Sequence, residues 1–204
     1  MFFNLCSQIL DVVMVMDIVT LMGGLLGVVL VVVVVYIYFY NRLQRFRNAA
    51  DAELGQIRVA MKKRLDMIEQ LLGAVQGYTK FEREVMEKVA ALRAGVLGAK
   101  PEELAKIESE SRSLLGTIRA VAEAYPDLKA STTVIKLMDA IVSVEDEIAR
   151  QRYTYNNVVQ ELNTMIDTIP SNVVAGMSGI MKQEYLRWGD EIETAPKLGG
   201  ISPK

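Results

Sequence analysis

The chain has 204 residues, with 23 Lys and Arg against 25 Asp and Glu, and it contains no histidine. Without histidine it cannot form a Glu-x-x-His di-iron site, a His-containing zinc site or a histidine-based acyl-transfer triad. Asp11 and Asp17 are the only charged residues before residue 42, so the rest of the chain carries 23 basic and 23 acidic residues. Such an even balance argues against a nucleic-acid binder. We therefore expect no catalytic residue, no metal site, no cofactor and no nucleic-acid partner.

Residues 1–17 form an amphipathic N-terminal segment. Its polar residues recur at helical spacing, and the other faces are apolar; they are Asn4, Ser7, Gln8, Asp11 and Asp17. This pattern is typical of a helix that lies in the outer membrane interface or packs against its neighbours. A lead-in without a function of its own is an equally good interpretation.

Residues 18–40 predict a transmembrane helix. They hold 23 residues without a charge, and about 20 apolar residues suffice to cross the hydrocarbon core of a bilayer. In lipid, a helix is the form in which a single segment satisfies all its backbone polar groups. A buried core helix would need layers of protein around it, and the remaining chain is too polar to supply them.

The charges beside this helix predict its orientation. Three basic residues, Arg42, Arg45 and Arg47, directly follow the helix. The only charged residues that precede it are Asp11 and Asp17. The positive-inside rule then places the N-terminus outside the cell membrane and residues 41–204 in the cytoplasm, after a single pass. The expected anchors at the inner interface are Tyr36, Tyr38, Tyr40, Arg42 and Arg45.

Three glycines mark one part of the predicted span. Gly23 and Gly27 are four residues apart, with Gly24 beside them. Small residues at this spacing let two membrane helices approach closely, so we expect helix packing here. The motif is short, and ordinary use of glycine in a membrane helix explains it as well.

Residues 41–188 predict a cytoplasmic helical bundle. The first helix has its apolar positions in steps close to an eleven-residue repeat, which keeps one face inward with little supercoil; they are Leu43, Phe46, Ala50, Leu54, Ile57, Met61, Leu65, Ile68 and Leu72. No proline lies between residues 18 and 77, so the membrane helix is expected to continue into the cytoplasm.

Later boundaries follow from capping residues and prolines. Thr79 and Glu82 match a capping box, Pro101 suits the first position of a helix, and Tyr125-Pro126 ends one. A last long helix runs to Pro170, with inward positions Val134, Leu137, Ile141, Val144, Ile148, Gln151, Tyr155, Val158, Leu162 and Met165. Gln151 either fixes register or finds a local partner. Residues 189–204 have no periodicity and are expected to be irregular.

Three clusters are candidate sites, each with a structural alternative. The apolar segment 173–181 is a candidate partner contact through Val173, Val174, Met177 and Ile180, or else a lid over the bundle. A polar group of Tyr155, Asn156 and Asn163 lines a ligand pocket or, as we favour, bonds neighbouring turns. The third cluster is a candidate phosphate or lipid site, or else a solvated helix face with i, i+4 pairs; its residues are Lys62, Lys63, Arg64 and Asp66.

The sequence resembles those of the LemA family of membrane-anchored prokaryotic proteins. The likeness rests on three stretches: Tyr40 to Leu43 with Arg47-Asn48; Lys63 to Asp66 leading to Gly77-Tyr78; and Tyr125 to Ala130, Tyr155-Asn156, Asn163, Pro170 to Asn172 and Ala175-Gly176. The chain departs from the family at Ile68 to Leu71, where the usual proline is missing, which predicts a straighter first helix.

The resemblance implies an outward-facing N-terminal anchor and an antiparallel four-helix bundle in the cytoplasm. It implies no established enzymatic activity. Some members of the family are associated with a membrane metalloprotease, and one branch serves magnetosome formation.

Three functions are compatible with these features. The first is a membrane-anchored, non-enzymatic scaffold or adaptor that self-associates through its N-terminal membrane region and presents the bundle to partners. The second is a signal-transmitting sensor or regulatory partner of a membrane protease, in which the long helix conveys an outside event. A carboxylate-based, Mg²⁺-dependent hydrolase ranks last, because the predicted inward positions are nearly all apolar.

Overall fold

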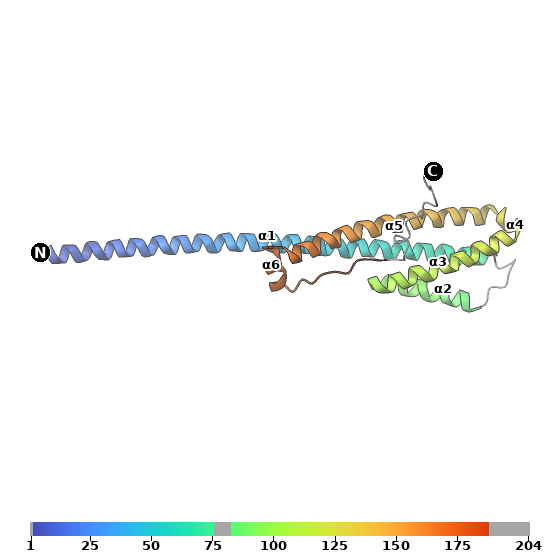
Figure 1. The fold of residues 1–204 in the computed structure, drawn as a ribbon, viewed down its shortest axis with the longest axis horizontal. Coiled ribbons are helices and arrows are strands. Elements are labelled where there is room, and N and C mark those ends of the chain that lie inside the picture. Colours follow the sequence, from blue (N-terminus) through green and yellow to red (C-terminus); the bar gives the residue numbers. More distant parts are fainter. Residues whose placement is uncertain (1, 76–82, 188–204) are drawn as a thin grey trace, which may run out of the picture. The chain divides into compact units, whose positions relative to one another are not determined.

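The computed structural model describes residues 2–75 and 83–187, and within them the side chains of residues 16, 17, 20–75 and 83–187. The predicted capping box at Thr79–Glu82 and the tail 189–204 lie outside this part. Every regular element within it is helical, which confirms the all-α prediction (Figure 1). The elements are α1 (Phe2–Val75), α2 (Arg83–Gly95), the 3-10 helix η1 (Val96–Gly98), α3 (Pro101–Ala124), α4 (Pro126–Lys129), α5 (Thr132–Asp167) and α6 (Ser171–Met177).

Helix α1 is one unbroken element of 74 residues. It includes both the apolar stretch 18–40 and the polar stretch that follows it. The expected continuation of the apolar helix into the polar part is therefore confirmed.

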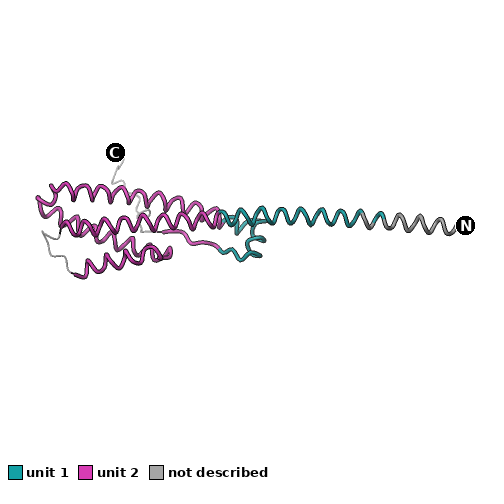
Figure 2. Tube along the Cα trace, turned by 180° about the vertical axis from the view of Figure 1, so that it is seen from behind, with its two compact units in different colours: residues 1–45, 164–181 teal, residues 46–163, 182–204 magenta. Residues whose placement is uncertain are grey.

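The chain divides into two compact units, coloured separately in Figure 2. Unit 1 comprises Met1–Arg45 and Thr164–Met181, and unit 2 comprises Phe46–Asn163 and Lys182–Lys204. Unit 1 thus joins the apolar part of α1 to the end of α5 and to α6. Sequence periodicity did not indicate this association.

Unit 2 is an antiparallel helical bundle. Successive helices alternate in direction, and α2, α3 and α5 lie along the second half of α1 (Figure 1). The inward face of α1 is the one that its repeat predicts, with Phe46 only partly buried. Its buried apolar residues in this unit are Ala50, Leu54, Ile57, Ala60, Met61, Leu65, Ile68, Leu71, Leu72 and Val75.

Helix α3 begins and ends where the prolines predict. Pro101 occupies its first turn, and the Glu103 carboxylate accepts a hydrogen bond from the Lys100 backbone N–H at 2.7 Å. The helix ends at Ala124, before Tyr125-Pro126. Where only a connection was expected, residues 126–129 form the single turn α4, which buries Leu128.

One inward position of α5, Val159, was not predicted from the sequence. Val159 is fully buried, whereas Val158 is only partly buried at the edge of the core. A straight helix drifts by about 20° per heptad, so over the 24 residues from Val134 the drift reaches about 70°. This rotation brings the residue after Val158 to the centre of the inward face.

Candidate functional site

The first candidate region is the apolar part of α1 in unit 1. One helix in the described part of the chain, Thr20–Val75, contains a window long and apolar enough to cross a membrane, with a mean hydropathy of 2.7 and none of it buried. Large apolar side chains from Leu21 to Val35 are exposed on every side of the helix. A helix that exposes apolar side chains on all its faces is expected to contact lipid, because such a surface is unfavourable in water.

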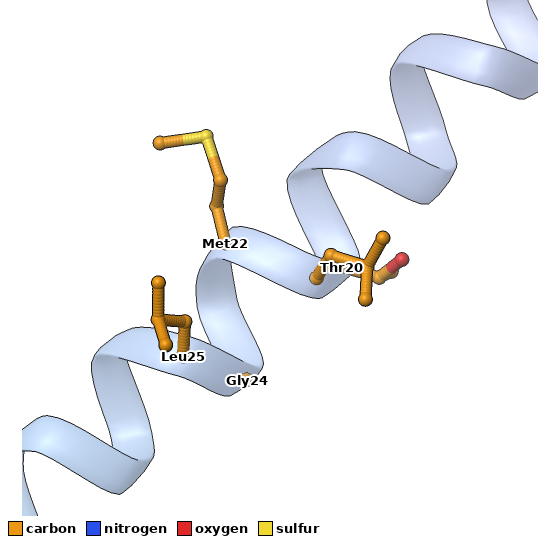
Figure 3. A pocket seen from close by; sticks show the side chains of 5 residues that line it. Thr20, Met22, Gly24 and Leu25 are labelled. Atoms are coloured by element: carbon orange, nitrogen blue, oxygen red, sulfur yellow. The ribbon is translucent and has the colours of Figure 1, made fainter.

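The three glycines of this region leave the helix surface open. A Cβ added at Gly23, Gly24 or Gly27 would meet nothing within 4 Å. Beside Gly24 the surface has a shallow apolar hollow, where Met22 and Leu25 project from the helix (Figure 3). The Thr20 hydroxyl donates within the helix to the carbonyl oxygens of Met16 at 3.0 Å and Asp17 at 2.9 Å, so it needs no outside partner.

The predicted interface anchors form an aromatic cluster near the end of the apolar stretch. Tyr36 stacks on Tyr40 with ring centroids 6.2 Å apart, and Tyr38 meets Phe39 edge to face at 5.2 Å. Of the basic anchors, Arg42 and Arg45 are both exposed. Their position at a membrane interface stays a prediction.

Helix α6 packs on this part of α1. The Tyr36 hydroxyl lies 3.2 Å from the Ser178 Oγ, at hydrogen-bond distance. An apolar groove runs between the two helices, lined by Val31, Val32, Val33, Val35, Tyr36, Pro170, Val173, Val174 and Met177.

The four residues of the candidate partner contact separate into two pairs. Val174 and Ile180 are buried within unit 1, whereas Val173 and Met177 are exposed. Only the latter pair is therefore available to a partner.

The end of α6 has a glycine C-cap. Gly179 has φ +64°, the left-handed region that side chains with a Cβ disfavour. The Ile180 N–H donates to the Ala175 carbonyl at 3.0 Å and the Gly179 N–H to the Gly176 carbonyl at 3.4 Å. This pair of bonds is a Schellman motif, and it satisfies the last carbonyls of the helix.

The polar group of Tyr155, Asn156 and Asn163 lies in unit 2. It bonds the backbone of the extended segment 182–187, which we name the strap. Asn156 accepts from the Leu186 N–H at 2.9 Å and donates to the Leu186 carbonyl at 3.0 Å. Asn163 makes the same pair with Gln183, at 3.0 and 2.9 Å. These groups therefore make structural hydrogen bonds, as the favoured interpretation expected, but their partner is the strap rather than a neighbouring helix and its turns.

The spacing of the two asparagines matches the strap. Asn156 and Asn163 are seven residues apart, which is about 10.5 Å along a helix, and three extended residues span about 10 Å. Each side-chain amide therefore pairs with a peptide group as a neighbouring β-strand would. Between them, the Tyr155 hydroxyl donates to the Glu184 carbonyl at 2.9 Å.

Burial raises the pKa of Tyr155 to about 12, and the nearby Asp51 and Glu184 carboxylates add to this effect. A raised pKa in the folded state means that Tyr155 contributes stability below pH 10, and that this is lost as the pH rises toward 12. We therefore expect the difference in unfolding free energy between wild type and Tyr155→Phe to shrink between these pH values. Urea titrations of both proteins followed by circular dichroism measure it. A difference that stays constant with pH contradicts the expectation.

The bundle contains a buried ion pair that was not predicted from the sequence. Arg64, 1% exposed, donates to both carboxylate oxygens of Glu108, at 3.1 and 2.5 Å, and also to the Ser111 hydroxyl. In the sequence, Ser111 interrupts the apolar stripe of α3 formed by Leu104, Ile107, Leu114 and Ile118, which is a signal for a polar contact there. Arg64 thus belongs neither to a phosphate site nor to a solvated face, while Lys62 and Asp66 do form the expected i, i+4 pair at 3.4 Å.

The charge state of Glu108 depends on its two arginines. Burial is the largest single effect and would raise the pKa of Glu108, but the bonded Arg64 guanidinium and Arg112 together outweigh it. The net effect lowers the pKa below its ordinary value. Within the described residues, no three His, Cys, Asp or Glu side chains gather in a way that would hold a metal ion.

Comparison of the sequence with known proteins shows the family of this chain. The LemA family matches residues 53–199, which is well over half of the chain. The chain belongs to the LemA family. Protein LemA of Metamycoplasma hominis is 29% identical over 142 residues, covering 69% of this chain and 65% of that protein.

Two further relatives of this LemA-family chain are magnetosome proteins. MamQ 2 of Paramagnetospirillum magneticum is 23% identical over 175 residues, and MamQ of Magnetospirillum gryphiswaldense is 23% identical over 173 residues. Each comparison covers 72% of this chain and 64% of the relative. The chain thus spans slightly less than two thirds of these relatives' length.

Proposed function

We propose that this LemA-family protein is a membrane-anchored, non-enzymatic scaffold or adaptor. It crosses the cell membrane once through residues 18–40, with its N-terminus outside and its bundle in the cytoplasm. Copies self-associate through the N-terminal membrane region and present the bundle to partner proteins.

The observation that carries this proposal is the two-part character of α1. Its side chains from Leu21 to Val35 are exposed and apolar, while those from Ala50 to Val75 supply the core of unit 2. One continuous helix therefore combines a lipid-compatible surface with the central element of a polar bundle. Such a helix couples anchoring to the presentation of the bundle.

The open glycine surface supports self-association. Because no side chain of the chain itself occupies the space over Gly23 and Gly27, another helix backbone can approach there. Helices in lipid associate through such close packing rather than through a hydrophobic driving force.

The proposal predicts the mass of the protein in a bilayer. In nanodiscs, light scattering should give the wild type a protein mass that is a multiple of 22.7 kDa. The double substitution Gly23→Leu/Gly27→Leu should reduce that mass toward the monomer, because the added side chains separate the backbones. Leu25→Phe is the matched control, since Leu25 lies on the opposite side of the helix and tests added bulk alone.

A wild-type protein that is monomeric in nanodiscs would overturn the self-association. The adaptor role would then rest on another membrane protein, such as a membrane metalloprotease, held by the bundle. A mass that falls equally in Leu25→Phe would show that the glycines have no special part.

A further inference from the structure

Residues 168–181 form a second apolar segment, far from the first in sequence. No charged residue lies between Asp167 and Lys182. Several of its large side chains face outward: Ile169 is 84% exposed, Met177 73% and Met181 81%. Val173, 58% exposed, is one helical turn from Met177 on α6, while Ile169 and Met181 flank the helix. These exposed side chains are apolar surface that unit 1 does not cover.

This segment lies beside the apolar part of α1 rather than beside its polar part. Its contacts on α1 extend from Val31 to Tyr36. At 1.5 Å per residue, these positions precede Tyr40 by about 14 Å and about 6 Å. The hydrocarbon core of one leaflet is about 15 Å deep. If residues 18–40 span the bilayer with Tyr40 at its inner interface, α6 is at the depth of the inner-leaflet acyl chains.

Several polar groups at the two ends of the segment have partners within the protein, as lipid requires. At its start, Ser171 Oγ donates to the Met165 carbonyl at 2.6 Å, and Asn172 Oδ1 accepts from the Val173 N–H at 2.8 Å. At its end, the Schellman bonds satisfy the carbonyls of Ala175 and Gly176. Non-helical backbone is tolerated at membrane depth only where such partners exist.

The Ser178–Tyr36 contact fits the same environment. Tyr36 is about 6 Å deeper in the membrane than Tyr40. Water is scarce at that depth, so a partner within the protein stabilises the Tyr36 hydroxyl. Ser178 supplies that partner at 3.2 Å.

We propose that residues 169–181 insert into the cytoplasmic leaflet beside the membrane span, with their exposed apolar face against lipid acyl chains. This inference rests on the proposed membrane crossing of α1. The chain then meets the bilayer twice, at 18–40 and at 169–181. The bundle is thereby tethered to the membrane through α1 and also through the segment that follows α5.

Site-directed spin labelling of the full-length protein in liposomes tests this. Cys6 is the only cysteine, so a Cys6→Ser background accepts a single label. Labels are placed at Met177→Cys in α6, at Val29→Cys in the span and at Ser113→Cys, which is exposed in unit 2. Collision rates with oxygen, which concentrates in lipid, and with a water-soluble nickel chelate report the surroundings of each label.

The proposal expects the Met177→Cys label to behave like the Val29→Cys label, with high oxygen and low nickel accessibility. The Ser113→Cys label should show the reverse. High nickel accessibility at Met177→Cys alone overturns the insertion and leaves the membrane crossing intact, whereas high nickel accessibility at Val29→Cys overturns the crossing itself. Low accessibility to both reagents at Met177→Cys, with broadening between labels of different copies, would place a second copy on this face and overturn lipid contact.

Discussion

Replacing Arg64 by Met should lower the free energy of unfolding by about 3–5 kcal/mol, the usual cost of breaking a buried ion pair. The substitution leaves the Glu108 carboxylate buried without its principal donor. Arg64 bonds both oxygens of that carboxylate, and both side chains are almost fully buried. Arg112, which is about half exposed and donates to the same carboxylate at 2.7 Å, replaces only part of that interaction.

Urea unfolding of the full chain in mild detergent, followed by circular dichroism, measures the loss. The double substitution Arg64→Met/Glu108→Leu should recover most of the stability, because apolar residues of similar size often replace a buried ion pair at little cost. Lys62→Met is the matched control on the same helix. Its partly exposed pair with Asp66 is worth about 0.5 kcal/mol or less.

The same pair predicts an acid-sensitive bundle. Since the pKa of Glu108 is lowered in the folded state, its contribution to stability is full above its ordinary value of 4.5. That contribution is lost as the pH falls through the lowered pKa. Wild type should therefore lose more stability on acidification below pH 4.5 than the double variant does. An equal loss in both proteins would assign the acid sensitivity to other groups.

The second large effect concerns the strap. In Asn156→Ala/Asn163→Ala, the amides of Gln183 and Leu186 should exchange hydrogen roughly 30- to 1000-fold faster. Four side-chain bonds disappear, and at a net worth of about 0.5–1 kcal/mol each the local opening free energy falls by about 2–4 kcal/mol. Hydrogen exchange of a peptide covering residues 182–187, detected by mass spectrometry, measures this directly.

Asn157→Ala provides a control for the strap experiment. Asn157 is the neighbour of Asn156 on α5 and is exposed. Its substitution removes an amide from the same helix without touching the strap, so exchange should be unchanged. If the strap of the double variant keeps its protection, then burial of Leu186, rather than the asparagines, holds it in place.

Local patterns in the sequence determined the helices and most of their inward faces. Apart from the partly buried Phe46, the residues of the repeat from Leu43 to Leu72 are buried. Pro101 lies where α3 begins, and Pro126 lies just after its end. These features follow from helical period and from the backbone restrictions of proline, which act within a few residues. The family resemblance, carried by short motifs at fixed spacing, is likewise confirmed.

Only the tertiary structure decided which distant residues meet. Lys62, Lys63 and Arg64 look alike in sequence, yet Arg64 alone is buried. Tertiary packing supplies its partner, Glu108 of α3, which is 44 residues away in sequence. The pairing of Asn156 and Asn163 with the strap joins residues 20 and 30 positions apart. The packing of α6 on the apolar part of α1 joins Tyr36 to Ser178 across 142 positions. Periodicity describes which face of a helix is apolar, but the partner of that face is chosen by packing of the whole chain.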